Sequence, residues 1–230
     1  MLLEVNIKRT GDDRPFSNEH IRIELDVGEC ICLGGVSGAG KSSISLHLVG
    51  LRTLPGAKVD VKWTDVHPVQ QAIGMLFQQG VLIDTLNVKE NIALALRSSG
   101  LPDDNQTITE AVKRVGLSEA DRFKMPGQLS GGMLRRASLA QVLAQRKTVI
   151  IPDEPFVGLD QVNANGISEL VNELNESGIG FILISHGPLY NEKILTKGKK
   201  EVFLEAKKET AKTSLSKHWF SRNSFFVNIR

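Results

Sequence analysis

Hydrophobic residues occur with two different spacings along the chain, and the two spacings predict different elements. Short, mostly apolar runs, typical of strands buried on both faces, stand at positions 30–33, 148–151 and 181–184. Between such runs apolar residues recur at helical spacing, as Ile167, Leu170, Val171 and Leu174 do at i, i+3, i+4 and i+7. Strands that alternate with helices in this way predict an α/β fold with a largely parallel sheet.

Two further helices are predicted in the first half of the chain. Ile44, Leu48 and Leu51 fall at i, i+4 and i+7 and predict one apolar helix face. Thr107 followed by Glu110 matches a capping box, which predicts that a helix around 111–115 opens there.

Helical patterns are densest in the middle of the chain. They predict an inserted helical subdomain at about 80–130, within a domain that spans residues 1–205. Residues 206–230 have no convincing period and are expected to form a separate basic-aromatic tail. That tail is expected to pack on a partner protomer, to be poorly ordered, or to lie on a lipid surface.

Charge is nearly balanced over the whole chain. Lys and Arg number 28 and Asp and Glu 26, a net charge of +2, so bulk charge gives no reason to expect a nucleic-acid partner. Cys30 and Cys32 lie two apart in a predicted strand, an awkward spacing for a disulfide, so both are predicted to be buried thiols. No apolar run is long enough to span a membrane, so any work at a membrane is expected to depend on a partner.

A glycine-rich motif follows the first of the predicted buried strands. Residues 35–42 fit G-x-x-x-x-G-K-[ST] and open a predicted helix, which is the context that a phosphate-binding loop requires. Glycines let the backbone wrap phosphates, and successive N–H groups then face the anion. We expect Lys41 to reach the β- and γ-phosphates of ATP and Ser42 to bind Mg²⁺. The predicted ATP-binding residues are Gly35, Val36, Ser37, Gly38, Ala39, Gly40, Lys41, Ser42 and Ser43.

Two carboxylates end the predicted strand at 148–151. In enzymes with a phosphate loop, an Asp at this point holds the metal, which assigns that role to Asp153. The neighbouring Glu154 is placed to polarise the attacking water. Pro152 has no N–H to give to a sheet, so we expect it to stand where the strand leaves its ladder.

Short motifs follow the phosphate loop later in the chain. Residues 129–133, Leu-Ser-Gly-Gly-Met, are similar to the signature sequence of the ABC ATPase family. Gln78 follows an apolar stretch as in its Q-loop, Asp160 ends a Gly-Leu-Asp like its D-loop, and His186 follows a strand as in its H-loop. Each motif alone is weak, but together they occur in the family's order around a phosphate loop. The resemblance covers about 4–205 and implies a P-loop NTPase fold with a small antiparallel β lobe.

The resemblance assigns a role to each matching residue. Glu154, His186 and Gln78 would be catalytic: Glu154 as general base, His186 at the γ-phosphate, and Gln78 at the metal or the attacking water. Ser42, Gln78 and Asp153 would serve Mg²⁺. Ser130, Gly131 and Gly132 would contact the ATP of a second protomer, and Asp160 would lie at the contact between protomers. A homodimer would thus enclose two ATP molecules and use its closure to drive a membrane partner.

The stretch 75–91, Met133 and residues 153–158 carry a narrower resemblance. They are similar to those of the Mla/Mce-type ATPases, which energise phospholipid movement between membranes. This resemblance implies a cytoplasmic protein held at the inner membrane by a permease that docks near 79–100, with an Mce-type substrate-binding protein in the assembly. The hydrolysis motifs fit equally well the ATPase of another ABC importer or exporter. A non-transport ABC ATPase is the third alternative, but such proteins generally carry two cassettes or long coiled coils.

Four positions depart from the family pattern. Phe16, which precedes Lys41 by 25 residues, is the only aromatic near the place where the family stacks adenine; if Phe16 does not stack on the base, the stacking is lost or is taken by Arg9 or Arg14. Gln78 follows Lys41 by only 37 residues, which suggests a trimmed β lobe. Gly187 stands where an Asp usually follows the His, and Gln161 replaces a Pro after Asp160. None of these changes removes a catalytic group.

Overall fold

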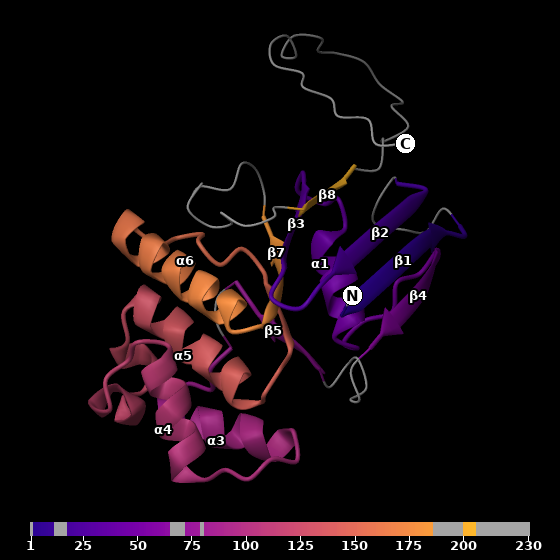
Figure 1. Ribbon diagram of the computed structural model, residues 1–230. Helices are drawn as coiled ribbons and strands as arrows, with labels where there is room; N and C mark the ends of the chain where they lie inside the picture. The colour runs from indigo at the N-terminus through magenta and orange to yellow at the C-terminus, as the bar shows by residue number, and fades with distance from the viewer. Residues whose placement is uncertain (1, 12–17, 65–71, 79–80, 186–199, 206–230) are drawn as a thin grey trace.

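The computed structural model describes residues 2–11, 18–64, 72–78, 81–185 and 200–205, which form two sheets flanked by helices (Figure 1). The central sheet has five strands, all parallel, in the order β5-β6-β7-β3-β8. They are β3 (Cys30–Gly35), β5 (Ile73–Leu76), β6 (Val149–Pro152), β7 (Gly180–Ile184) and β8 (Lys200–Leu204). The structure therefore confirms the predicted α/β fold and its three predicted strands.

The two faces of the central sheet belong to two different hydrophobic cores, because side chains alternate along each strand. Ile31 and Leu33 pack with helix α1 (Lys41–Leu48) and with the second sheet. Cys30 and Leu183 pack on the opposite face with α6 (Gln161–Glu176) and the helices that precede it. Both cysteines are buried and free, as predicted, and burial raises the pKa of the Cys30 thiol.

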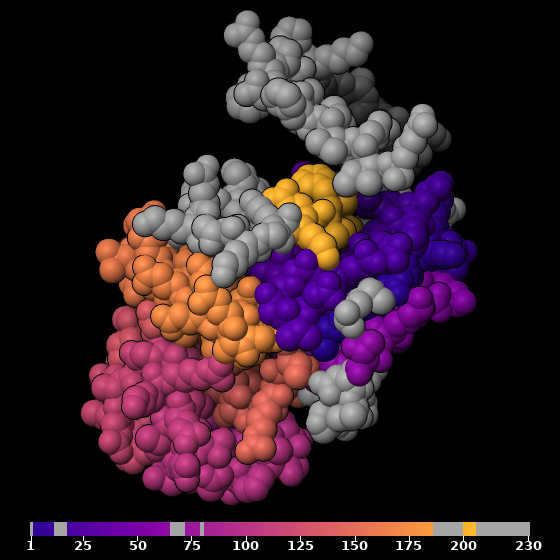
Figure 2. Space-filling view, viewed as in Figure 1, coloured from indigo at the N-terminus to yellow at the C-terminus, as the bar shows by residue number. Residues whose placement is uncertain are grey.

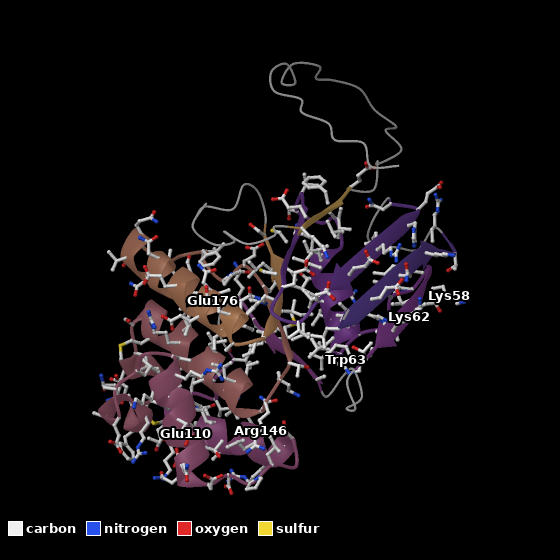
Figure 3. The ribbon with its side chains drawn as sticks, viewed as in Figure 1. Lys58, Lys62, Trp63, Glu110, Arg146 and Glu176 are labelled. Atoms are coloured by element: carbon white, nitrogen blue, oxygen red, sulfur yellow. The ribbon has the colours of Figure 1, made fainter. Side chains whose placement is uncertain are left out.

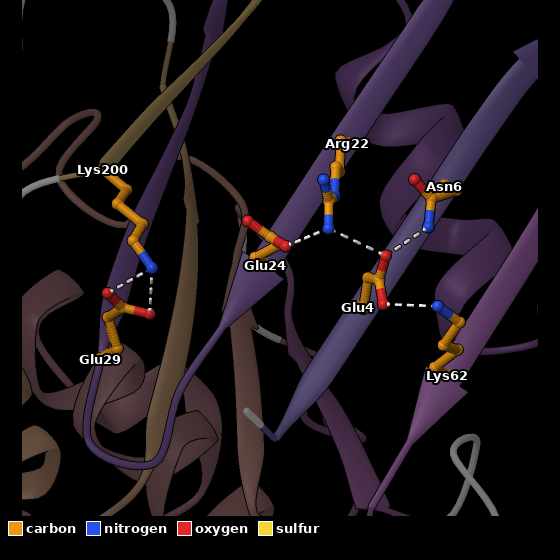
Figure 4. A network of polar contacts seen from close by, with 7 residues as sticks. All are labelled: Glu4, Asn6, Arg22, Glu24, Glu29, Lys62 and Lys200. Carbon is orange, nitrogen blue, oxygen red and sulfur yellow. Dashed lines mark hydrogen bonds and ion pairs between the residues drawn. The ribbon is translucent and has the colours of Figure 1, made fainter.

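The second sheet is antiparallel and has the order β2-β1-β4. Its strands are β1 (Leu3–Arg9), β2 (His20–Leu25) and β4 (Ala57–Trp63), the last of which carries Lys58 and Lys62 (Figure 3). On β1 the side chain of Glu4 accepts hydrogen bonds from Asn6 and Lys62, each at 2.9 Å, and lies 3.3 Å from Arg22 (Figure 4). These contacts, that of Asn6 first, lower the pKa of the Glu4 carboxyl. They tie the three strands together on the face away from the core.

The helices between β5 and β6 pack together as a lobe beside the central sheet (Figure 2). They are α3 (Val88–Ser98), α4 (Asn105–Arg114), two short 3₁₀ turns (Ala120–Phe123 and Pro126–Gln128) and α5 (Gly131–Ala144). Helix α5 leads directly into β6, so it joins the lobe to the sheet. Among the described residues, no helix is long and apolar enough to cross a bilayer.

Two helix boundaries differ from the predicted ones. Helix α4 begins at Asn105, and its N-cap is Asp104, whose side chain accepts a hydrogen bond from the backbone N–H of Thr107. The capping box predicted at Thr107 was wrong because an acidic residue three positions earlier caps the helix first. Helix α1 ends at Leu48, so Leu51 is 66% exposed, whereas Ile44 and Leu48 are buried as predicted.

Pro152 lies within β6, at a gap in the pairing of β6 with β7. The two strands pair at Ile150, and their next partnership is a single bridge from Asp153 to Ile184. The N–H of Asp153 turns toward β5, where it donates to the carbonyl of Leu76 at 2.8 Å. Because backbone donors alternate in direction along a strand, the nitrogen of Pro152 faces β7. The missing donor thus coincides with the interrupted ladder, as the sequence predicted.

Candidate functional site

The glycine-rich loop leaves the end of β3 and leads into α1 at Lys41. Gly38 and Gly40 have φ angles of 76° and 93°, in the left-handed region where a side chain is strained. A Cβ built on Gly38 would meet no described atom within 4 Å, so the space beside this glycine is open. No side chain of the described residues caps α1, and the first N–H groups of a helix have no partner within the helix. A phosphate group fits such a cradle.

Lys41 is buried and points back along the loop. Its Nζ donates to the carbonyl oxygens of Gly35 at 2.6 Å and Val36 at 2.9 Å. Burial lowers the pKa of Lys41, while the negative charge of Asp153 acts in the opposite direction. Among the described residues, the groups that hold the ammonium group are therefore two carbonyls of the loop and not a carboxylate.

Ser42 and Asp153 meet across the edge of the sheet, although 111 residues separate them. The Oγ of Ser42 donates to the Oδ2 of Asp153 at 3.2 Å. β3 and β6 are not neighbours, since β7 lies between them, so this contact bridges the end of β7. Two hard oxygen donors fit Mg²⁺, which commonly binds one or two protein oxygens together with substrate phosphates and water. The described residues contain no group of three or more His, Cys, Asp or Glu side chains that could hold a metal ion.

Glu154 stands just beyond β6 in an unusual backbone conformation. Its φ of 51° is one of two positive values among the described residues other than glycine. Its N–H donates to the carbonyl of Ile184 at 3.1 Å, and its own carbonyl accepts from Arg135 at 3.2 Å. A left-handed conformation costs free energy for a residue with a Cβ, so the surrounding contacts must hold it.

Gln78 lies two residues beyond β5 and is exposed. β5 pairs with β6, so Gln78 emerges at the same edge of the sheet as Asp153. Ser185, the last described residue after β7, also lies at this edge, where its N–H approaches the carbonyl of Leu33 at 3.4 Å. His186 follows it but is outside the described residues, as are Phe16, Gly187 and the tail 206–230.

The predicted signature segment forms the start of α5. Ser130 is its N-cap, and the Ser130 Oγ accepts from the N–H of Met133 at 3.3 Å. The two glycines that follow differ in their surroundings. A Cβ on Gly132 would lie 2.2 Å from the Oδ1 of Asn163, whereas a Cβ on Gly131 would be 3.9 Å from Leu159, an ordinary contact. Packing within the chain thus explains Gly132 but leaves Gly131 unexplained.

Asp160 is the N-cap of α6. Its two carboxylate oxygens accept hydrogen bonds from the backbone N–H of Asn163 at 2.8 Å and from its side chain at 2.9 Å. The hydrogen bonds from Asn163, that of the backbone first, lower the pKa of Asp160. Gln161 occupies the first helical position, where the N–H needs no partner within the helix, so a Pro is not required there.

Two residues near the site were not found from the sequence. Arg135 donates from Nη1 to the carbonyl of Glu154 and from Nη2 to that of Val157 at 2.7 Å. Asn163 fills the space above Gly132 and binds Asp160. Both are polar residues on helices, and no spacing distinguishes them from ordinary surface positions. Only their contacts with residues far along the chain reveal them.

Comparisons with known proteins agree with this geometry. A family model for ABC transporters matches residues 19–157. The thiamine import ATP-binding protein ThiQ of Ruegeria sp. is 35% identical over 170 residues, which cover 71% of this chain and 73% of ThiQ. The protein mkl of Mycobacterium leprae, an ATP-binding protein named for ribonucleotide transport, is 28% identical over 232 residues, covering 89% of this chain and 67% of mkl.

The fold is also that of a solved ATP-binding cassette. The dimeric cassette MJ0796 in a post-hydrolysis state, bound to ADP and Pi, is similar with a TM-score of 0.69 and 24% identity, over 92% of this chain and 100% of that one. The family match spans more than half of the chain and contains the phosphate loop, the signature segment and both acidic residues. The chain therefore belongs to the ABC transporter family, in which it is an ATP-binding and ATP-hydrolysing subunit.

Proposed function

We propose that two copies of this chain enclose two ATP molecules, each bound by the phosphate loop of one protomer and the signature segment of the other. The contact of Ser42 with Asp153 carries the first half of this proposal, because it brings two oxygen donors together beside the open loop. Residues 35–43 hold the phosphates, and Lys41 neutralises the β- and γ-phosphates. Ser42, Asp153 and Gln78 would serve Mg²⁺, which when bound screens phosphate charge.

The chain's own residues then position the attacking water. Glu154 accepts the proton of the water as general base, and His186 contacts the γ-phosphate. Ser130, Gly131 and Gly132 contribute the start of α5 to the partner's ATP, and Asp160 lies at the contact between protomers. Gly131 supports this arrangement, because no contact within the described chain requires a glycine there, whereas a close approach by another molecule would require one.

Alanine at the two signature glycines is expected to have two different effects. Gly132→Ala should lower the free energy of unfolding by about 1–3 kcal/mol, because its Cβ must displace the Asn163 side chain and break the hydrogen bond from that side chain to Asp160. Gly131→Ala should leave the free energy of unfolding within about 0.5 kcal/mol of the native value. Gly131→Ala should instead weaken the dimer that forms with ATP. Urea denaturation without nucleotide measures the free energy of unfolding of both variants, and sedimentation with ATP measures how strongly each variant dimerises.

Unchanged dimerisation of Gly131→Ala, in a protein of native stability, would show that the signature segment does not meet the partner's ATP. The Gly132→Ala variant serves as the control for damage within the chain. A comparable loss of stability in both variants would instead assign both glycines to packing.

For the cargo, we propose phospholipids moved between membranes, by a complex in which this subunit lies on the cytoplasmic side of the inner membrane. The proposal is carried by the stretch 75–91 together with Met133 at the end of the signature. The permease would dock near residues 79–100, where Val81 and Ile83 are 59% and 45% exposed. Asn91 holds this segment, since its buried side chain donates to the carbonyls of Ile83 and Leu86. An Mce-type substrate-binding protein would complete the assembly.

Purification of the tagged chain from its own host with mild detergent tests the cargo. We expect a permease to be recovered together with bound phospholipid, and Ile83→Asp to lose both by placing a charge on the docking surface. Phe123→Asp is the matched control: Phe123 is also exposed on the helical lobe, but it lies outside 79–100. Recovery of a sugar, peptide or vitamin permease without lipid would contradict the proposal.

A second candidate is the ATPase of another importer, which the identity with ThiQ favours. The same purification distinguishes the two, because the co-purified permease and its small-molecule ligand would then replace the lipid.

A further inference from the structure

Arg135 is a buried guanidinium on helix α5. It is 8% exposed, and among the described residues it donates to two carbonyl oxygens: that of Glu154, 3.2 Å from Nη1, and that of Val157, 2.7 Å from Nη2. Burial lowers the pKa of Arg135. Burying a charge is costly, and an apolar side chain of similar size often packs in its place without loss of stability. Stability alone therefore does not account for an arginine at this position.

The two carbonyls belong to the turn that carries Glu154. The N–H of Val157 donates to the carbonyl of Glu154 at 3.3 Å, which closes the turn 154–157. Arg135 reaches the first and last residues of this turn with its two terminal nitrogens, a bridge that suits the fixed fork of a guanidinium and not the single ammonium of lysine. On the other side, the N–H of Glu154 is held by Ile184 of β7. The left-handed backbone of Glu154 is thus fixed between a strand and Arg135.

The same helix begins with the signature segment. Ser130 caps α5, and Arg135 lies five residues further, a rise of about 7 Å along the helix axis. The start of α5 also contacts the start of α6, since Gly132 packs against Asn163, which binds Asp160. Helix α5 therefore presents its N-terminus outward and holds the turn after β6 from within the chain.

We propose that Arg135 is a positioning residue for ATP hydrolysis, which fixes the turn 154–157 and so orients the Glu154 carboxylate toward the attacking water. Through α5 it links the signature segment, where the partner's ATP binds, to the general base of its own chain. This inference rests on the proposed roles of Glu154 and of the signature segment. Arg135 touches neither substrate nor the reacting atoms, and it acts only through the backbone of the turn.

Arg135→Met tests the proposal, because methionine fills the buried site and removes both donors. We expect kcat to fall about 10- to 100-fold, with KM for ATP within about twofold of the native value. The kcat of Arg135→Lys, which has one ammonium group in place of the guanidinium, should lie between that of Arg135→Met and that of the native protein. The matched control is Arg136→Met: Arg136 is the next residue of α5 and also donates to a carbonyl, that of Val115 at 2.6 Å, but its guanidinium lies beside Gly116 and Gly166 and its bonded carbonyl is outside the turn 154–157. That variant should keep the native kcat.

A double-mutant cycle with Glu154→Gln separates positioning from general damage. If Arg135 acts through Glu154, then Arg135→Met should cause no further loss of single-turnover rate in the Glu154→Gln background. The proposal would be overturned if a folded Arg135→Met kept the native kcat. It would also be overturned if Arg135→Met lowered the rate equally in the native and the Glu154→Gln background, or if Arg136→Met lowered kcat as much as Arg135→Met does. If Arg135→Met does not fold, Arg135→Lys decides by the same criteria. A fully active Glu154→Gln would refute the role of Glu154 itself, which is a different result.

Discussion

Replacement of Lys41 by alanine is expected to weaken ATP binding by at least about 100-fold, because it removes the charged donor nearest to the phosphates. The Nζ of Lys41 already lies at the loop, where it donates to the carbonyls of Gly35 and Val36. When ATP binds, phosphate oxygens should replace these carbonyls as acceptors for the Nζ of Lys41, because charged oxygens accept stronger hydrogen bonds. Equilibrium binding of a fluorescent ATP analogue, with ATP as competitor, measures the loss.

The control must remove an equal charge elsewhere. Lys58→Ala serves, since the Lys58 side chain is 68% exposed and lies 3.6 Å from Asp60 on β4, in the antiparallel sheet. Lys41→Met adds a second check, because it fills the buried space of the Lys41 stem and separates lost phosphate contacts from a collapsed loop. Native affinity in both Lys41 variants would refute the assignment of Lys41 to the phosphates.

Much of the central sheet was predictable, because strands buried on both faces leave short apolar runs that stand out from their surroundings. The strands at 30–33, 148–151 and 181–184 appear in the structure as β3, β6 and β7, and the loop and the acidic pair follow from where β3 and β6 end. Pro152 was also placed correctly, since a residue without an N–H has few positions open to it in a sheet. These features depend on local sequence alone.

Other features depend on competition between neighbouring residues for the same role, or on contacts between residues far apart in the chain. No local sequence pattern reveals them. The start of α4 was misplaced because Asp104 and Thr107 are both acceptable caps, and only the folded backbone decides between them. Leu51 continues a helical period beyond the point where α1 ends. The bridge from Arg135 to Glu154 spans 19 residues and two elements, so no pattern within either element reveals it.

Glu154→Gln is expected to keep ATP binding and to lose about 10²- to 10⁴-fold in the rate of hydrolysis, the usual share of a general base. The amide cannot accept the proton of the attacking water, yet it has nearly the shape of the carboxylate, so the phosphate loop and the turn 154–157 should be unchanged. Because hydrolysis is slowed and binding is not, the dimer that encloses ATP should accumulate. Steady-state phosphate release and size-exclusion chromatography with ATP measure the two effects.

Glu176→Gln is the matched control for this variant. Glu176 is the last residue of α6 (Figure 3), and its side chain is exposed, so the same loss of charge there should leave the rate and the dimer as they are in the native protein. Hydrolysis at the native rate by Glu154→Gln would mean that another group takes the proton. A loss of ATP affinity equal to the loss of rate would instead assign Glu154 to nucleotide binding. A slow variant that binds ATP normally but stays monomeric would separate the base from closure of the dimer, and would then place the control of closure in the signature segment.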